Sequence, residues 1–193
     1  YAFKSFAYAH TVDREMRVWV CTSNYGVYVL DGETGELLKH IDDAILSSNK
    51  QEKIAQLNDS IFFFSFDLLN AYNANTGDNR ILSYSEGLIS NDILSMVVDK
   101  DGFLWLYTPN GICRYNYHQK SFTHYDQKDE FGPLEKDGFA ATVTHDGKII
   151  FAAYRSISVF NPMQFNTSVK PDRPILTHIK LFDQYLFVDS LNT

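Results

Sequence analysis

Short runs of apolar and aromatic residues alternate with turn-forming residues along the whole chain. The clearest example is residues 103–116 (FLWLYTPNGICRYN), where Pro109, Asn110 and Gly111 separate an apolar run from one that alternates apolar and polar residues. Proline fixes φ, and asparagine and glycine tolerate a positive φ, so these three residues favour a tight turn. The pattern therefore predicts two short β-strands joined as a hairpin.

The same hairpin pattern occurs four times, at intervals of about 43 residues. Moving it forward by one interval places Trp105 on Ile150, and moving it back by one places Trp105 on Phe62. A second step back places Gly111 on Gly26, with one extra residue in the turn of the first copy. A sheet-forming repeat of this length is typical of the four-stranded blades of a β-propeller.

The predicted fold class is all-β, with four four-stranded antiparallel blades that form part of a larger propeller. Helical repeats of similar length would require an amphipathic 3.6-residue period, of which the chain shows little. Four blades can also close a ring in other proteins, so the number of blades in the intact propeller stays open. The fourth copy has no clear outer strand. The predicted blades cover residues 5–45, 52–86, 87–130 and 137–165.

The remaining residues, 166–193, do not continue the repeat. Pro171 and Pro174 lie close together in this segment, and each proline lacks the backbone donor that a sheet ladder needs. The sequence therefore predicts blades over residues 1–165, followed by a linker and then either the start of a β-sandwich domain or a tail packed on the blades.

Composition narrows the range of partners. Aromatic residues make up 15% of the 193 residues, which favours β structure. The net charge of −7 argues against binding to nucleic acid or to an anionic membrane surface, since both need a basic patch. No apolar run reaches the ~18 residues expected of a membrane-spanning helix. We expect Cys21 and Cys113 to be small buried hydrophobic residues rather than a disulfide or a metal site.

The candidate catalytic groups do not form a recognisable set. The six histidines show no metal-ligand spacing, and the patterns GxSxG, HExxH, CxxC and the phosphate-binding loop do not occur. Acidic pairs such as Asp42-Asp43 lack the spacing of a calcium-binding loop. We therefore expect no catalytic residues, no metal and no cofactor.

Polar and aromatic residues in the predicted loops form the candidate binding site. If each blade runs from an inner to an outer strand, the turn between its second and third strands shares a face with the entry to its first strand. Amides, carboxylates, an arginine and tyrosine rings on this face suit a sugar, with its hydroxyl groups and apolar ring face. Alternatively, Asn91 and Asn110 merely form turns. The candidate ligand-binding residues are Asn24, Tyr25, Asp67, Asn91, Asp92, Asn110, Tyr154 and Arg155.

The third copy resembles the two-component regulator propeller repeat. The residues that carry the resemblance are Gly87-Leu88, Ser90-Asn91, Asp99, Gly102, Leu104-Trp105, Thr108, Asn110-Gly111, Tyr115-Asn116, Phe122 and Tyr125. Ser156 and Leu68 depart from the pattern, because the repeat has glycine at those positions. Residues 157–184 also resemble the exit of such propellers into a small β-sandwich domain.

This resemblance implies the periplasmic sensor region of a bacterial hybrid two-component sensor histidine kinase. Such a region would recognise a glycan-derived oligosaccharide, another small ligand or a partner without catalysis, and would relay the signal to the kinase. The parent protein would be a membrane-anchored homodimer, and this chain a soluble part of it. Two alternatives stay open. One is a propeller-type glycan lyase or hydrolase, with Asp67, Asp92 and Arg155 meeting at one sugar; the other is a protein-interaction scaffold.

Overall fold

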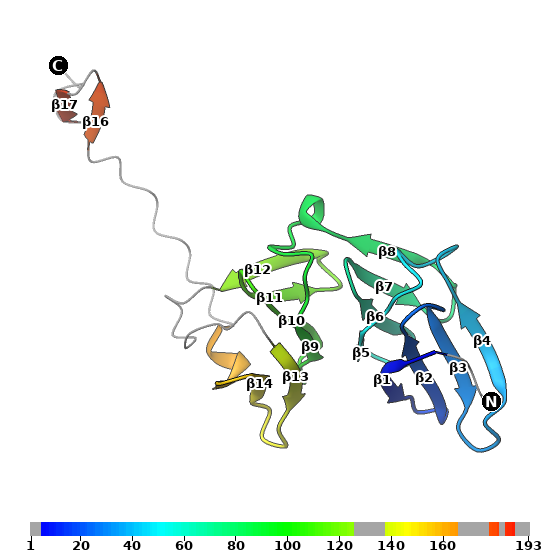
Figure 1. Ribbon diagram of the computed structural model, residues 1–193. Helices are drawn as coiled ribbons and strands as arrows, with labels where there is room; N and C mark the ends of the chain where they lie inside the picture. Colours follow the sequence, from blue (N-terminus) through cyan, green and yellow to red (C-terminus); the bar gives the residue numbers. More distant parts are fainter. Residues whose placement is uncertain (1–4, 126–137, 166–177, 182–183, 188–193) are drawn as a thin grey trace. The chain divides into compact units, whose positions relative to one another are not determined.

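The computed structural model describes residues 5–125, 138–165, 178–181 and 184–187. The chain divides into two compact units, Tyr1–Pro162 and Met163–Thr193. The first unit holds four antiparallel sheets in which each strand pairs with the next along the chain, and Figure 1 shows these sheets as successive blades. The all-β propeller fold predicted from the repeat is therefore confirmed.

Three of the blades have four strands each. Blade one consists of β1 (Ala7–Val12), β2 (Arg17–Thr22), β3 (Val27–Asp31) and β4 (Leu37–Ile41). Blade two consists of β5 (Lys53–Gln56), β6 (Ile61–Ser65), β7 (Leu69–Asn73) and β8 (Asn79–Leu82), and the 3₁₀ helix η1 (Tyr84–Glu86) follows it. Blade three consists of β9 (Ser95–Val98), β10 (Phe103–Thr108), β11 (Gly111–Asn116) and β12 (Ser121–Tyr125).

Blade four has three strands among the described residues. They are β13 (Gly138–Val143), β14 (Ile149–Ala153) and β15 (Ile157–Phe160), and the 3₁₀ helix η3 (Pro162–Phe165) follows. Its sheet thus has one strand fewer than predicted for a full blade, at the place where the sequence shows no clear outer strand.

The second unit contains one antiparallel pair, β16 (His178–Leu181) with β17 (Gln184–Phe187). The predicted linker over residues 166–174 lies outside the described residues. The assignment of residues 166–193 to a β-sandwich domain or to a tail stays a prediction.

An aromatic pair recurs at each junction between blades. The rings of Trp19 in β2 and Tyr72 in β7 have centroids 6.4 Å apart. Phe63 in β6 lies 6.1 Å from Tyr115 in β11. Trp105 in β10 lies 5.1 Å from Phe160 in β15. The first member of each pair is buried, and such pairs add about 0.5–1.5 kcal/mol beyond the burial of their area. The repeat therefore encodes the surface on which one blade packs against the next.

The strand register corrects one part of the sequence alignment. The counterpart of Trp105 in blade two is Phe63, not Phe62, because Phe63 faces blade three as Trp105 faces blade four. Phe62 points the other way and stacks on Trp19 of blade one, with ring centroids 3.9 Å apart. The shift arises because three residues separate Ser65 from its partner Leu69 in β7, whereas four separate the equivalent Tyr107 from its partner Ile112 in β11.

A buried aspartate and a tryptophan hold the start of the second strand in blades one and three. Asp99 Oδ2 accepts a hydrogen bond from Trp105 Nε1 at 2.7 Å, and its Oδ1 accepts one from the backbone N–H of Phe103 at 2.9 Å. Asp13 likewise accepts from Trp19 Nε1 at 2.8 Å. In blade two Leu57 occupies this position, so the carboxylate is not required by every blade.

Both cysteines are buried and free, as predicted. Burial raises the pKa of the thiol of Cys113 to about 11, because the charged thiolate is poorly solvated there. Burial also raises the pKa of Cys21. Both thiols therefore stay protonated near neutral pH and behave as small apolar side chains.

Candidate functional site: a pocket between blades two and three

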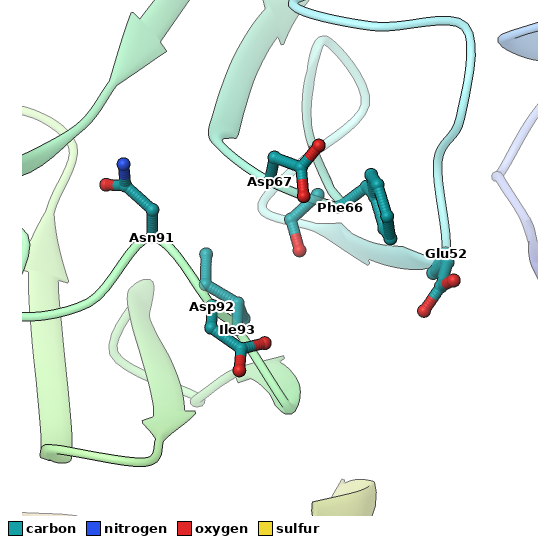
Figure 2. A pocket seen from close by; sticks show the side chains of 7 residues that line it. Glu52, Phe66, Asp67, Asn91, Asp92 and Ile93 are labelled. Carbon is teal, nitrogen blue, oxygen red and sulfur yellow. The ribbon is translucent and has the colours of Figure 1, made fainter.

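A pocket of about 370 Å³ lies between loops of blades two and three (Figure 2). Its size fits the lower part of the range for small-ligand sites, roughly 300–1,000 Å³. The residues that line it are Glu52, Ser65, Phe66, Asp67, Asn91, Asp92 and Ile93.

The topology of the blades brings these residues together. Ser65 ends β6, and Phe66 and Asp67 form part of the turn to β7. Glu52 directly precedes β5, whereas residues 91–93 lie just before β9. The pocket therefore lies where the second strand of a blade ends and the first strand begins. This is the face on which the sequence predicts ligand contacts.

The pocket exists because blade two has a small residue at a position that blade three fills with a ring. The backbone N–H of Glu52 donates to the backbone O of Ser65, and in blade three the backbone N–H of Leu94 donates to that of Tyr107. Ser65 and Tyr107 therefore occupy equivalent positions in their blades. Tyr107 is buried, and its ring centroid lies 5.4 Å from that of Phe151 in blade four. The serine side chain leaves the corresponding space between blades two and three open.

The turn of blade two also lacks the bonds that close the turns of its neighbours. Thr108 Oγ1 donates to the backbone O of Gly111 at 2.8 Å, and Thr22 Oγ1 donates to that of Gly26 at 2.9 Å. Gly111 has a φ of 141°, and a Cβ there would lie 2.7 Å from the backbone O of Tyr125. Blade two has Phe66 and Leu68 at these positions, so its turn is built differently.

Two polar atoms of the lining are buried without a hydrogen-bond partner among the described residues. They are Ser65 Oγ, on a side chain with 0% exposure, and Asn91 Oδ1. An unsatisfied buried polar group costs about 1–3 kcal/mol, and such groups often mark functional positions. The equivalent residue in the loop before β5 is Asn49, which follows Ser48 as Asn91 follows Ser90. Unlike Asn91 Oδ1, Asn49 Oδ1 has a partner, because it accepts from the backbone N–H of Asp43 at 3.0 Å.

Charged groups surround the pocket. Glu52 pairs with Lys50 at 2.9 Å and with Lys53 at 3.3 Å. Burial alone would raise the pKa of Glu52, but the hydrogen bonds and charges of the two lysines outweigh burial and hold that pKa below its ordinary value of 4.5. The ammonium of Lys50 also lies 3.6 Å from the ring centroid of Phe66. Glu52 is therefore ionised near neutral pH, and Lys50 is engaged with both pocket residues.

Three of the eight predicted ligand-binding residues meet in this pocket: Asp67, Asn91 and Asp92 (Figure 2). The other five do not line it. Asn24 donates to Ser23 Oγ, and the backbone N–H of Tyr25 donates to Thr22 Oγ1. Asn110 donates to the backbone O of Ile89 at 3.0 Å. Tyr154 and Arg155 lie together in the β14–β15 turn, with the guanidinium 5.9 Å from the tyrosine ring. A ligand-binding role for these eight residues stays a prediction.

The sequence analysis missed four pocket residues: Glu52, Ser65, Phe66 and Ile93. One signal was available, because Leu68 was recognised as a departure from the glycine of the repeat. That departure marks the turn in which Phe66 and Asp67 lie. Ser65 could have been found only with the correct register, which aligns it with Tyr107.

Among the described residues, no group of three or more histidine, cysteine, aspartate or glutamate side chains is arranged to hold a metal ion. Within the same residues, no helix has the length and hydropathy needed to cross a bilayer.

The fold and the pocket define the class of protein: a β-propeller repeat protein with a ligand-sized pocket between two blades. Residues 87–110 match the family model described as two component regulator propeller. The resemblance to the two-component regulator propeller repeat is therefore confirmed over these residues, which include β9 and β10 of blade three. No curated protein matches the chain by sequence.

Solved structures share the fold. Two are extracellular domains of proteins from B. thetaiotaomicron that are assigned as hybrid two component systems. The chain is 20% identical to the first, with a TM-score of 0.54 over 84% of this chain and 29% of that one. It is 19% identical to the second, with a TM-score of 0.66 over 84% of this chain and 21% of that one. A streptogramin B lyase is 16% identical, with a TM-score of 0.61 over 82% of this chain and 51% of that one.

The chain thus spans less than a third of the two extracellular domains that it matches.

Proposed function

We propose that this chain is part of the extracytoplasmic sensor region of a two-component signalling protein, and that the pocket between blades two and three binds a glycan-derived ligand. The observation that carries the proposal is the pocket itself. It combines an aromatic ring, Phe66, with carboxylates and an amide, which is the mixture that a sugar's hydroxyl groups and ring face require. The repeat in blade three supports the signalling role.

The pocket's position suggests how a bound ligand transmits a signal. Ligand contacts from both blades would link the β6–β7 turn to the loop before β9 and so favour one arrangement of the two blades. A ligand can shift a conformational equilibrium only as far as it binds one state more tightly than the other. In the periplasmic part of a homodimeric, membrane-anchored receptor, such a shift would reach the histidine kinase.

Oligosaccharide binding tests the proposal. The 193-residue chain is titrated by calorimetry with oligosaccharides released from bacterial, plant and animal polysaccharides. The Ser65→Tyr variant fills the pocket, because it places in blade two the tyrosine that blade three has at the equivalent position. We expect at least one oligosaccharide to bind the wild-type chain and to lose affinity at least about tenfold in Ser65→Tyr. Binding that survives in Ser65→Tyr, or no binding at all, would contradict the proposal.

A second candidate function is a propeller-type glycan lyase or hydrolase. It is favoured by one observation: Asp67 and Asp92 line the same pocket, as a pair of catalytic carboxylates would. Arg155, the third residue that this alternative requires, is not among the lining residues. Product analysis after prolonged incubation with each bound oligosaccharide distinguishes the two functions. Cleavage that is lost in Asp67→Asn and Asp92→Asn would establish the enzyme, whereas intact oligosaccharide supports the sensor.

A further inference from the structure

The carboxylates of the pocket are not equally compensated. Glu52 forms ion pairs with Lys50 and Lys53. Asp67 and Asp92 are exposed, and neither has an ion-pair partner among the described residues. The pocket therefore presents two carboxylates without an ion-pair partner among the described residues. The charge of Asp67 acts on Lys50 only from a distance, and the ammonium of Lys50 is already paired with Glu52.

The hydrogen-bonding groups of the pocket are mainly acceptors. The carboxylates of Asp67 and Asp92 only accept, and Asn91 Oδ1 is an acceptor without a partner among the described residues. Ser65 Oγ, fully buried and also unpartnered, can donate or accept. A ligand that satisfies this lining must bring several N–H or O–H donors. A group that also carries positive charge would satisfy the acceptors and compensate the carboxylates at once.

The equivalent loop of blade two shows how the protein itself places a cation in such surroundings. Ser48 and Asn49 align with Ser90 and Asn91, so Lys50 occupies the position of Asp92. The Lys50 ammonium lies 3.6 Å from the ring centroid of Phe66 and 2.9 Å from the carboxylate of Glu52. The ring of Phe66 and the carboxylate of Glu52 therefore already bind an ammonium group within the protein. In the loop before β9, the negatively charged Asp92 takes the place of Lys50. Among the described residues, no cation occupies the position in the pocket that corresponds to that of Lys50 beside Phe66 and Glu52.

We propose that the pocket selects a cationic sugar, an amino sugar with a free ammonium group, and rejects anionic sugars such as uronates. This inference rests on the proposed function of the pocket as a carbohydrate site and names the class of carbohydrate. The ammonium binds beside Asp67 and Asp92, while the remaining hydroxyl groups donate to Asn91 and Ser65.

Three oligosaccharides of equal length test the inference: tetramers of glucosamine, of N-acetylglucosamine and of galacturonate. Each is titrated into the 193-residue chain by calorimetry at low ionic strength and mildly acidic pH, where the free amine is protonated. We expect the glucosamine tetramer to bind about tenfold more tightly than the acetylated tetramer, and the galacturonate tetramer to bind most weakly. Added salt should narrow these differences, because it screens exposed charges.

Charge-neutralising variants locate the effect. Asp67→Asn and Asp92→Asn each remove one exposed charge and should weaken glucosamine binding by about two- to five-fold, with little effect on the acetylated tetramer. Asp78→Asn is the matched control. It removes one exposed carboxylate from the β7–β8 turn, at the opposite end of the blade, and should leave all three affinities unchanged.

The outcomes separate the inference from the proposed function. If the galacturonate tetramer binds as tightly as the glucosamine tetramer and Ser65→Tyr abolishes both, the charge selection is wrong and the carbohydrate site stands. Equal weakening by Asp78→Asn and Asp92→Asn would also overturn the charge selection. If none of the three tetramers binds, or if their binding survives in Ser65→Tyr, this inference falls, and in the second case the pocket is not the carbohydrate site.

Discussion

Blades two and three are built on the same repeat, but they differ at the turn between their second and third strands. In blade three, Thr108 and Gly111 close this turn with a buried hydrogen bond, and Tyr107 fills the space toward blade four. In blade two, Phe66 and Leu68 replace the threonine and the glycine, and Ser65 replaces the tyrosine. The pocket lies at the turn where the repeat is not kept.

The comparison separates residues that maintain the fold from residues that create a site. The aromatic contacts between blades recur at all three junctions, since each blade must bury its apolar faces against the next. The turn is free to vary, because loops at the end of a blade contribute less to packing. A departure from the repeat is therefore a better guide to function here than a residue that matches it.

The largest expected effect comes from giving blade three the serine of blade two. Tyr107→Ser should lower the free energy of unfolding by about 3–5 kcal/mol, because it removes a buried ring and leaves a cavity against Phe151. Urea denaturation measures the change. The reverse substitution, Ser65→Tyr, should cost at most about 1–3 kcal/mol, since it fills a space that is already open. If both variants lost the same free energy of unfolding, the space beside Ser65 would not be open to a ring in the way that this comparison requires.

A smaller loss is expected where blade three has the buried carboxylate and blade two has Leu57. Asp99→Ala leaves the N–H groups of Trp105 and Phe103 without their acceptor, which should cost about 1–3 kcal/mol of stability. The control is Asp78→Ala, whose side chain lies in an exposed turn. If the two variants are equally stable in urea, the aspartate of blade three contributes no more than a surface residue.

The pocket serine should stabilise the fold when it is made apolar. Ser65→Ala removes a buried hydroxyl that has no partner among the described residues, so the free energy of unfolding should rise by up to about 1 kcal/mol. Thr108→Val, the comparison in blade three, removes a hydroxyl that is hydrogen-bonded and should lower it by a similar amount. A loss of stability in Ser65→Ala would mean that the hydroxyl is satisfied within the protein.

The smallest effect concerns acid stability in blade one. Burial alone would raise the pKa of Asp13, but the hydrogen bonds of Trp19 and Arg17 and the charge of Arg17 outweigh burial and hold it below the ordinary value of 3.8. Its ionised form therefore stabilises the fold above pH 3.8, and this contribution is lost as the pH falls through the folded-state pKa. The stability gap between wild type and Asp13→Asn, measured by urea denaturation, should narrow below pH 3.8. A constant gap would contradict this assignment.

Much of the fold could be predicted from the sequence, because each blade repeats the same apolar runs and turn residues. The strands of blade three follow from these patterns, and so do the three strands that blade four has among the described residues. The register of blade two could not be predicted, since Phe62, Phe63 and Phe64 are consecutive rings, all of which are fully buried. Only the contacts with blades one and three show which ring replaces Trp105.

The site was predictable only in part. The rule that second-strand turns and first-strand entries share a face correctly brought Asp67, Asn91 and Asp92 together. The same rule also selected Asn110, which does not line this pocket and whose amide donates to the backbone O of Ile89. Ser65 was not predictable, because its importance depends on what is absent: a ring at one position of one junction. A pattern of residue types does not reveal such a space without the packing around it.

A crystal structure of the chain with the glucosamine tetramer tests the central claim most directly. The account predicts a sugar ring between the β6–β7 turn and residues 91–93, with a donor within hydrogen-bond distance of Ser65 Oγ and the amine beside Asp67 or Asp92. A tetramer bound elsewhere on the blades, with this pocket unoccupied, would contradict it.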